Sequence, residues 1–349
     1  MKNPSSKNRV VRVGDRTIGA GRTFLIADVG SNHKQDLQLA FESIHAAAEA
    51  GADAVKFQSL QMKELYLDPS EDVKRLYSLI DLQEEWHAEL KVQCEKRNVL
   101  FFSSPTYFGA VDLMEKLDVV LYKLASAQIG TFPQIVERVA LTGKPVIMST
   151  GLVTMGELEA CVRIFDKAAN PNFVILHCNS VYPTPYNRVN LPLMQTYQNM
   201  FGCPVGYSDH TEDIHIALVA VGCGASVIEK HFSLSLEFDT PDTIVALDPK
   251  GFSRLTEGVR AVEQALTPHS RIHIEPSEQD FKKSLAYRLV LARPKRPGES
   301  FDSSDFLYLR NAKGIDCRDE AIVIEHFCAC QALPPGKPLE WGMLQGITA

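Results

Sequence analysis

The stretch Ala54-Val-Lys-Phe-Gln58 places polar side chains at the end of a short apolar run. Residues two apart in a strand share a face, so Lys56 and Gln58 are expected to point to the same side. Strands of a parallel sheet covered by helices on both faces are nearly continuous apolar runs of this kind. This stretch therefore predicts one strand of a parallel sheet, with functional groups gathered at its carboxyl end.

Eight such runs alternate with amphipathic helical stretches between Thr23 and Leu266. The expected strands are 24–29, 54–58, 99–103, 119–124, 145–149, 173–177, 204–207 and 226–231. Nearly every run ends in polar or charged residues, whereas an open doubly wound sheet gathers its functional groups at one switch point. Eight units in about 245 residues, without a Gly-x-Gly-x-x-Gly motif, predict an α/β protein with a TIM (β/α)₈ barrel.

The composition changes after Leu266. Residues 267–278 are polar, contain two prolines and are expected to form a linker. Short β-prone runs follow at 287–292, 306–309 and 321–324. We therefore predict a catalytic barrel over residues 1–282, with the linker from about 267, and a small β-rich domain over 283–349.

Composition and charge exclude several classes of protein. The 349-residue chain carries a formal net charge of −7, whereas a nucleic-acid binder is usually basic. No apolar run approaches the roughly 20 residues of a membrane-spanning helix, and residues 1–12 lack the apolar core of a signal peptide. The eight scattered cysteines are expected to be buried, reduced thiols. These features predict a cytoplasmic enzyme without nucleic-acid or membrane partners.

Lysines at the ends of two expected strands indicate an anion site. Lys56 ends the second strand and Lys123 the fourth, and a buried lysine is costly unless it is paired. Ser126, Ser149 and Ser208 add hydroxyls beside helix starts, which together with the lysines would cradle a phosphate. The alternative is that each lysine forms a salt bridge with a carboxylate on a neighbouring strand.

Two histidines end neighbouring strands. His210 ends the seventh and His231 the eighth, and two imidazoles with water and substrate oxygens suit Mn²⁺ or a similar ion. The alternative is a pair of hydrogen-bonding histidines without metal. His33, in the loop after the first strand, is expected to orient the site. The histidines expected at the surface are His45, His87, His215, His269 and His273.

The strand-end motifs together resemble those of the sialic acid synthases and related nonulosonic acid synthases. The tail from Lys283 is similar to the family's antifreeze-like (SAF) domain, a β-clip fold. The similar segments in the barrel are Ile26-Ala-Asp-Val-Gly-Ser-Asn-His33, Ala50–Gln58, Tyr122–Ser126, Ser149–Gly151, Leu176–Pro185, Gly206–Thr211 and Glu229–Phe232.

The resemblance implies a transferase that condenses phosphoenolpyruvate with an open-chain N-acylated hexosamine, N-acetylmannosamine or a relative. Water is the third reactant, and the products are a nine-carbon 2-keto sugar acid and phosphate. The implied phosphoenolpyruvate contacts are Lys56, Ser104, Lys123, Ser126, Ser149 and Ser208. The implied sugar contacts are Asp28, Gln58, Asn179, Ser180, Tyr182, Asp242 and Arg310.

The resemblance also implies a cofactor and a partner. His210 and His231 would hold a divalent metal, Mn²⁺ first, with Mg²⁺ or Co²⁺ as alternatives. Asp28 or Glu229 would handle a proton. Arg310 would act in the neighbouring subunit of a domain-swapped homodimer.

Departures from the family pattern lie mostly on the sugar side. Asp28 stands where the family usually has Glu, and Ser180 where many members have Asn. Gln128 replaces a common acidic residue, and Arg310-Asn-Ala-Lys-Gly-Ile315 replaces Arg-Pro-Gly-x-Gly-Ile. The departures leave open a di-N-acetylated 6-deoxyhexose, the precursor of legionaminic or pseudaminic acid, as the substrate. A heptulosonate-type synthase and a non-enzymatic carbohydrate- or ice-binding protein are further alternatives.

Overall fold

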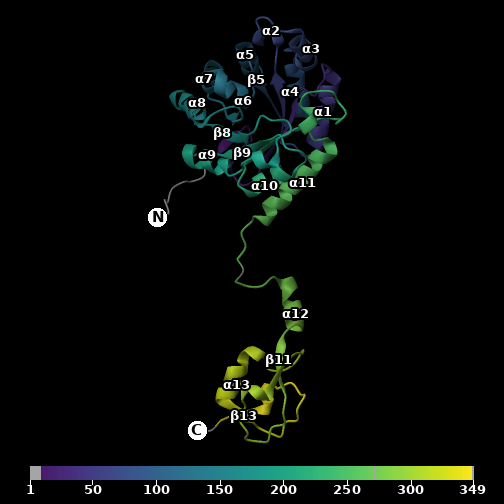
Figure 1. Ribbon diagram of the computed structural model, residues 1–349, viewed down its shortest axis with the longest axis vertical. Helices are drawn as coiled ribbons and strands as arrows, with labels where there is room; N and C mark the ends of the chain where they lie inside the picture. The colour runs from purple at the N-terminus through teal and green to yellow at the C-terminus, as the bar shows by residue number, and fades with distance from the viewer. Residues whose placement is uncertain (1–8, 271, 348–349) are drawn as a thin grey trace. The chain divides into compact units, whose positions relative to one another are not determined.

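The strand-and-helix alternation of the sequence appears directly in the computed structural model of the chain (Figure 1). The structure describes residues 9–270 and 272–347. Its contacts divide the chain into two units, one ending at Thr267 and one starting at Pro268. Each unit is described by itself below.

The first unit is built on eight parallel strands. Their hydrogen-bonded order is β5-β4-β3-β10-β9-β8-β7-β6, so the first strand of the series pairs with the last and only β5 and β6 stand at the ends. This near-closed ring confirms the predicted TIM barrel. The strands are β3 Phe24–Gly30, β4 Ala54–Ser59, β5 Leu100–Pro105, β6 Tyr122–Leu124, β7 Val146–Ser149, β8 Phe173–Cys178, β9 Val205–Asp209 and β10 Val227–His231.

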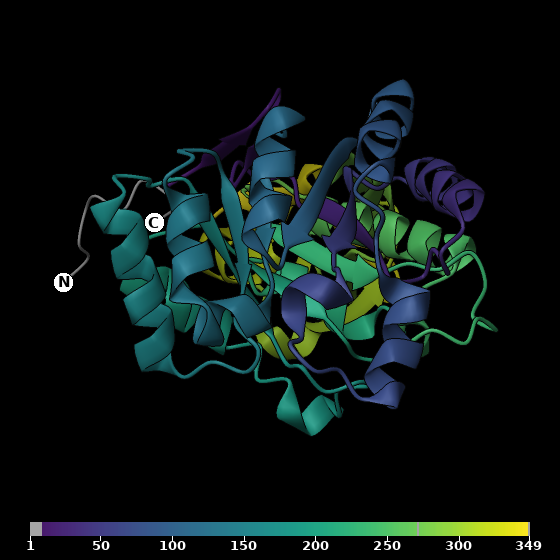
Figure 2. The same cartoon turned by 90° about the horizontal axis from the view of Figure 1, so that it is seen from above.

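Helices surround the barrel on its outside, as the view from above shows (Figure 2). Asp36 caps the first of them, because its carboxylate accepts from the backbone N–H groups of Gln38 and Leu39. The covering helices are α1 Leu37–Glu49, α4 Trp86–Lys96, α5 Phe108–Lys116, α7 Pro133–Ala140, α8 Met155–Lys167, α9 Leu193–Phe201, α10 His215–Gly222 and α11 Pro249–Ala265. The short helices α2 Met62–Leu65, α3 Glu71–Ile80 and α6 Ser126–Thr131 were not predicted.

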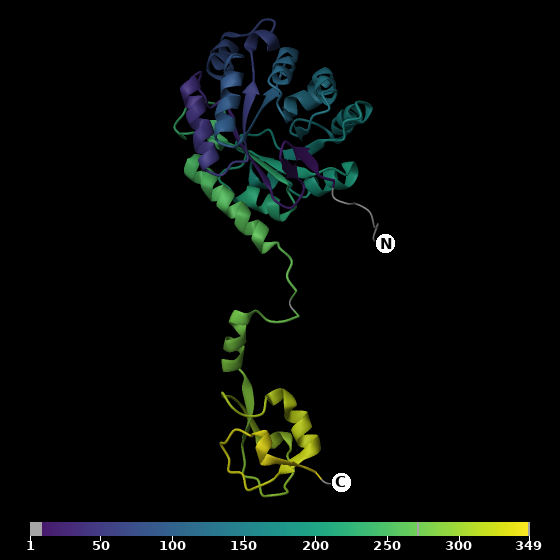
Figure 3. The ribbon, with the colours of Figure 1, turned by 180° about the vertical axis from the view of Figure 1, so that it is seen from behind.

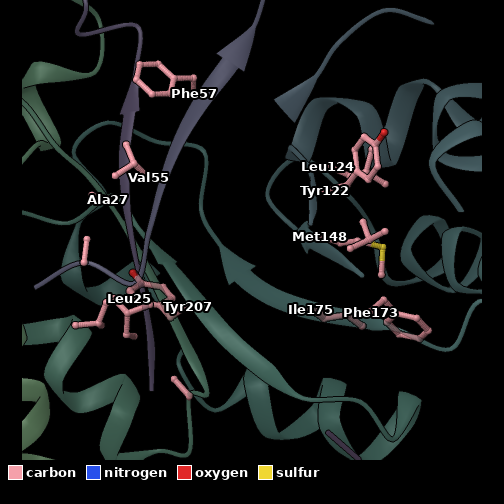
Figure 4. Close-up of a cluster of buried hydrophobic side chains, with 14 of the residues drawn as sticks. Leu25, Ala27, Val55, Phe57, Tyr122, Leu124, Met148, Phe173, Ile175 and Tyr207 are labelled. Atoms are coloured by element: carbon pink, nitrogen blue, oxygen red, sulfur yellow. The ribbon is translucent and has the colours of Figure 1, made fainter. Parts of the chain in front are cut away.

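Side chains alternate along each strand between two apolar layers. Those that point outward meet the helices, and Figure 4 shows Leu25, Val55 and Tyr207 among them. Those that point inward, such as Phe24 and Phe102, fill the barrel interior. The same alternation directs Lys56 and the other polar strand-end residues inward.

A hairpin that sequence reasoning missed fills the amino-terminal end of the barrel. β1 (Val11–Val13) pairs antiparallel with β2 (Arg16–Ile18). Val11, Val13 and Ile18 are fully buried and belong to the same cluster as the inward-facing barrel residues. The barrel is therefore packed with side chains at this end, while polar groups occupy the other.

In its described residues, the second unit contains two small antiparallel sheets and two α-helices; Figures 1 and 3 show them. Its buried residues include Leu289, Leu291, Phe301, Phe306 and Val323. Its elements are α12 Pro276–Ser284, β11 Tyr287–Leu291 paired with β12 Phe306–Arg310, α13 Glu320–His326, and β13 Phe327–Ala329 paired with β14 Leu344–Gly346.

The expectation of a strand over 321–324 is wrong, because these residues lie in α13. The β-branched residues there favour a strand locally. Tertiary contacts decide otherwise: Val323 is buried on one side of a helix, and Ile324 packs partly against the same cluster. Residues 276–278 of the expected linker belong to α12.

All eight cysteines are free thiols, and five of them are buried. The expectation of burial is wrong for Cys223 and Cys330, which are exposed, and Cys317 is half-buried. Within the described residues, no helix combines the length and apolar character needed to cross a membrane.

Candidate active site

The carboxyl ends of the barrel strands surround a cavity of about 300 Å³. Most of its walls are inward-facing strand-end residues, and the rest come from the loops that follow. The lining residues are Asp28, Lys56, Gln58, Lys123, Ala125, Ser126, Ala127, Ser149, Leu152, Cys178, Ser180, Tyr182, Ser208, His210, Glu229 and His231. Most of the predicted site residues are thus brought together in one place.

Glu229 lies between the two buried lysines. Its Oε1 is 3.3 Å from Lys123 Nζ and its Oε2 is 4.0 Å from Lys56 Nζ. Ser208 Oγ donates to Oε1 at 2.9 Å. Asp28 Oδ2 is 2.7 Å from Lys56 Nζ. Both lysines are therefore paired with carboxylates, as the salt-bridge alternative expects, and both also line the cavity. Anion binding by these lysines stays a prediction.

The lysines differ in how well their charge is compensated. Burial lowers the pKa of Lys56, but Asp28 and Glu229 outweigh it and the pKa is raised. Burial also lowers the pKa of Lys123, and here the opposing Glu229 does not suffice, because Lys56 adds repulsion. Burial raises the pKa of Glu229, yet both lysines hold it well below its usual value. An anion bound beside Lys123 would stabilise its charged form.

Serine hydroxyls in the same region lack partners. Ser149 Oγ in the cavity wall and Ser104 Oγ on β5 are buried without a hydrogen bond. Ser104 itself does not line the cavity. A Cβ on Gly151 would lie 2.9 Å from Ser126 Oγ and 2.3 Å from Ser180 Oγ, so a glycine is needed there for these hydroxyls to converge. Buried hydroxyls that are free to donate, beside two lysines, suit the oxygens of a phosphate group.

The two predicted metal-binding histidines stack on each other, with ring centroids 5.3 Å apart. His210 Nδ1 bonds to the Asn179 carbonyl oxygen at 2.7 Å, and Tyr182 OH lies 3.1 Å from its Nε2. His231 Nδ1 is buried without a hydrogen bond, 3.6 Å from Asp28 Oδ2. Burial lowers the pKa of His231, which favours the neutral imidazole that a metal requires.

The two imidazoles are chemically suitable ligands for a divalent ion. Their number is too small to complete the coordination of the ion by themselves. Within residues 9–270 and 272–347, no three His, Cys, Asp or Glu side chains form a ready metal site. Both imidazoles line the cavity, and the Nδ1 of His231 lacks a hydrogen bond. Mn²⁺ accepts such a mixed set of nitrogen and oxygen ligands.

Four predicted site residues lie outside the cavity wall. Ser104 is one of them. The Asn179 side chain donates to the Arg188 carbonyl oxygen at 3.1 Å. The backbone carbonyl oxygen of Asn179 is the group that contacts the site, through its bond to His210. Asp242 Oδ2 is 3.8 Å from His231 Nδ1, just behind the wall. Arg310 belongs to the second unit, where its guanidinium lies over the Tyr287 ring at 5.3 Å.

One other histidine is placed differently from expectation, and His33 lies in the expected loop after the first strand. His87 was expected at the surface, which is wrong: it is fully buried and its Nε2 bonds to Ser59 Oγ at 2.8 Å. His33 is buried against Phe57 and Trp86 and does not line the cavity. Sequence reasoning treated Cys178 as a structural thiol, yet it lines the cavity and lies 3.7 Å from His210 Nδ1.

Comparison with known proteins adds to this geometry. The model of the NeuB family matches residues 43–271, which is more than half of the chain. The chain belongs to the NeuB family. The resemblance indicated by the strand-end motifs is thereby confirmed.

Relatives within the NeuB family carry the names of different sugar acids. The N,N'-diacetyllegionaminic acid synthase of Campylobacter jejuni is 34% identical over 84% of this chain and 92% of its own. The pseudaminic acid synthase of Helicobacter pylori is 33% identical over 83% and 89%. The crystal structure of the N-acetylneuraminic acid synthetase of Leptospira borgpetersenii superposes with a TM-score of 0.72, at 32% identity, covering 79% of this chain and 96% of that one. Because these relatives are about equally similar to the chain, the comparison does not identify which sugar it uses.

His33 is expected to make stability depend on pH. Burial, partly opposed by Asp242, lowers its pKa to about 4. The folded protein therefore binds fewer protons than the unfolded chain below about pH 6.5, and stability falls as the pH drops toward 4. His33→Gln should remove up to about 3 kcal/mol of this loss in the free energy of unfolding, measured with urea at several pH values. His215→Gln, at an exposed position, is the control, and an equal slope in both variants would contradict the prediction.

Proposed function

We propose that this chain is a nonulosonic acid synthase. It condenses phosphoenolpyruvate with an open-chain N-acylated hexosamine and water, and releases a nine-carbon 2-keto sugar acid and phosphate. The observation that supports this most is the pair of buried lysines, beside the unpartnered hydroxyl of Ser149, in the cavity of a NeuB-family barrel. N-acetylmannosamine is the first candidate sugar, and a di-N-acetylated 6-deoxyhexose is the alternative.

The proposed phosphoenolpyruvate site uses Lys56 and Lys123 with four hydroxyls. The ligand's phosphate and carboxylate would compensate the lysine charges, Lys123 most of all, since its pKa is lowered in the free protein. Fixed cations and hydroxyls also stabilise charge that moves onto the departing phosphate. The hydroxyls are those of Ser104, Ser126, Ser149 and Ser208.

The proposed reaction forms a carbon–carbon bond first. C3 of phosphoenolpyruvate attacks the sugar's aldehyde carbon, whose oxygen takes up a proton, and positive charge develops at C2. Water adds at C2 and gives up a proton, and the tetrahedral product expels phosphate. Glu229 is the proposed acceptor of the water's proton, because it is held as a carboxylate between the lysines and its Oε2 lacks a hydrogen bond.

Asp28 takes a different role in this proposal. Its Oδ2 is 2.7 Å from Lys56 Nζ and 3.6 Å from His231 Nδ1, which places it on the histidine side of the cavity. With Gln58, Ser180 and Tyr182 it would bind the sugar's hydroxyls. A Mn²⁺ ion held by His210 and His231 would supply Lewis-acid polarisation of the aldehyde oxygen.

The second unit is proposed to be the SAF domain of a domain-swapped homodimer. Arg310 ends β12 with an exposed side chain, so it is available to another molecule. In the proposal it reaches the sugar's N-acyl group in the partner's barrel. The apolar core of the second unit is small, which is consistent with a domain that packs on a partner.

Phosphate release is expected to depend on an N-acylated hexosamine. The assay measures phosphate from phosphoenolpyruvate with Mn²⁺ and, in turn, N-acetylmannosamine, its di-N-acetylated 6-deoxy analogues and erythrose 4-phosphate. At least one hexosamine should give turnover and erythrose 4-phosphate none. Turnover with erythrose 4-phosphate alone would instead indicate a heptulosonate-type synthase, and no turnover with any of them a binding protein.

His210→Ala and His231→Ala are each expected to lower phosphate release by at least about a hundredfold, because each removes one of two proposed metal ligands. Titration calorimetry with Mn²⁺ should show binding to the metal-free wild type and none to either variant. His215→Ala, an exposed histidine, is the matched control. Full activity after thorough chelation, with no metal recovered from the protein, would refute the metal proposal.

Subunit mixing is expected to show whether Arg310 acts in the partner. Lys56→Ala and Arg310→Ala should each inactivate the homodimer. In a swapped heterodimer one of the two sites keeps both residues, so random mixing should recover roughly a quarter of wild-type activity. Recovery that stays at background after verified subunit exchange would place Arg310 outside the partner's site.

A further inference from the structure

Three consecutive residues at the carboxyl end of β3 hold a loop that follows the neighbouring strand β10. They are Gly30, Ser31 and Asn32, and the loop connects β10 to α11. Asp242 lies in this loop, directly before the 3₁₀ turn η2 (Thr243–Val245). Because no strand carries Asp242, the position of its carboxylate depends on contacts that reach the loop from elsewhere.

Asn32 fixes the path of the loop. Its side-chain Nδ2 donates to the Phe232 carbonyl oxygen at 2.9 Å, where the loop leaves β10. Its Oδ1 accepts from the Thr240 and Thr243 hydroxyls on either side of Asp242. Asn32 is fully buried, so these bonds are shielded from water.

Gly30 provides the space that Asp242 occupies. Its φ of +52° lies in the left-handed region. A Cβ on Gly30 would stand 2.7 Å from Asp242 Oδ2 and 3.3 Å from Gln58 Nε2. Any side chain here would therefore displace the Asp242 carboxylate from its place beside the cavity residues Asp28 and Gln58.

Ser31 holds the carboxylate itself. Its hydroxyl donates to Asp242 Oδ2 at 2.7 Å and its backbone N–H donates to the same oxygen at 3.2 Å. Every hydrogen bond that the described residues make to this carboxylate falls on Oδ2. Oδ1 therefore remains able to accept a hydrogen bond. Ser31 is not among the residues to which the family resemblance assigns a role.

We propose that Ser31 is a positioning residue for sugar recognition. It fixes one oxygen of Asp242 so that the other can accept a hydroxyl of the bound hexosamine. The proposal rests on the proposed function, because it takes the ligand to be the sugar. It differs from a purely structural role in one respect: loss of the Ser31 hydroxyl weakens sugar binding and leaves phosphoenolpyruvate binding intact.

The test is steady-state kinetics of phosphate release by the full-length protein with Mn²⁺ and the hexosamine that the wild type uses best. Ser31→Ala should raise KM for the sugar about tenfold, the effect of losing one hydrogen bond to a charged group, with KM for phosphoenolpyruvate within about twofold of wild type. Ser31→Thr, which keeps the hydroxyl, should stay closer to wild type. Ser43→Ala is the control, because Ser43 is an equally buried serine whose hydroxyl donates to Leu39 within α1.

A double-mutant cycle separates this role from general destabilisation. In an Asp242→Ala background, Ser31→Ala should leave the sugar KM unchanged, since the group it positions is gone. A sugar KM no different from that of Ser43→Ala would overturn the proposal, and so would equal rises in both KM values or fully additive effects in the cycle. Absence of phosphate release by the wild type with every hexosamine would instead contradict the proposed function.

Discussion

Two positive charges buried inside the barrel are the constraint that shapes the rest of the site. Lys56 and Lys123 point inward because of strand alternation, and such charges are tolerated only with partners close by. Glu229 lies between them and Asp28 contacts Lys56, so two carboxylates balance two ammonium groups. The free cavity is thereby close to electrically neutral, although the chain as a whole carries −7. Net charge was good grounds for excluding nucleic acid and carried no information about an anionic substrate.

The barrel was predictable because it follows from local rules. Period-two alternation placed Lys56 and Gln58 on one face, and the polar ends of eight runs distinguished a barrel from an open sheet. The β1–β2 hairpin was missed although its alternating Val11 and Val13 and its Gly-Asp turn were a usable signal. α13 was misassigned because the preference of its β-branched residues was overridden by burial of one helical face.

The site was predictable where residues sit on strands and less so where they sit on loops. His210 and His231 reached one cavity because neighbouring parallel strands end at the same edge. His87 resembled a surface helix residue, yet it is buried and its ring bonds to Ser59, 28 residues away. The hydrogen bond between Ser31 and Asp242 joins residues 211 positions apart, and no local sequence pattern predicts it. Contacts of that kind require the fold to be known.

The hairpin at the amino-terminal end of the barrel also limits the routes by which molecules can reach the cavity. With Val11, Val13 and Ile18 packed into that end, molecules enter and leave through the mouth formed by the strand-end loops. Lys56 and Lys123 lie deep, each about 2% exposed, whereas Tyr182 at the rim is 41% exposed. In the proposed reaction both substrates would therefore share one entrance, because Asp28 on the sugar side is as deeply buried as the two lysines. A packed amino-terminal end would thus leave the ring of strand-end loops as the shared route for substrates and products.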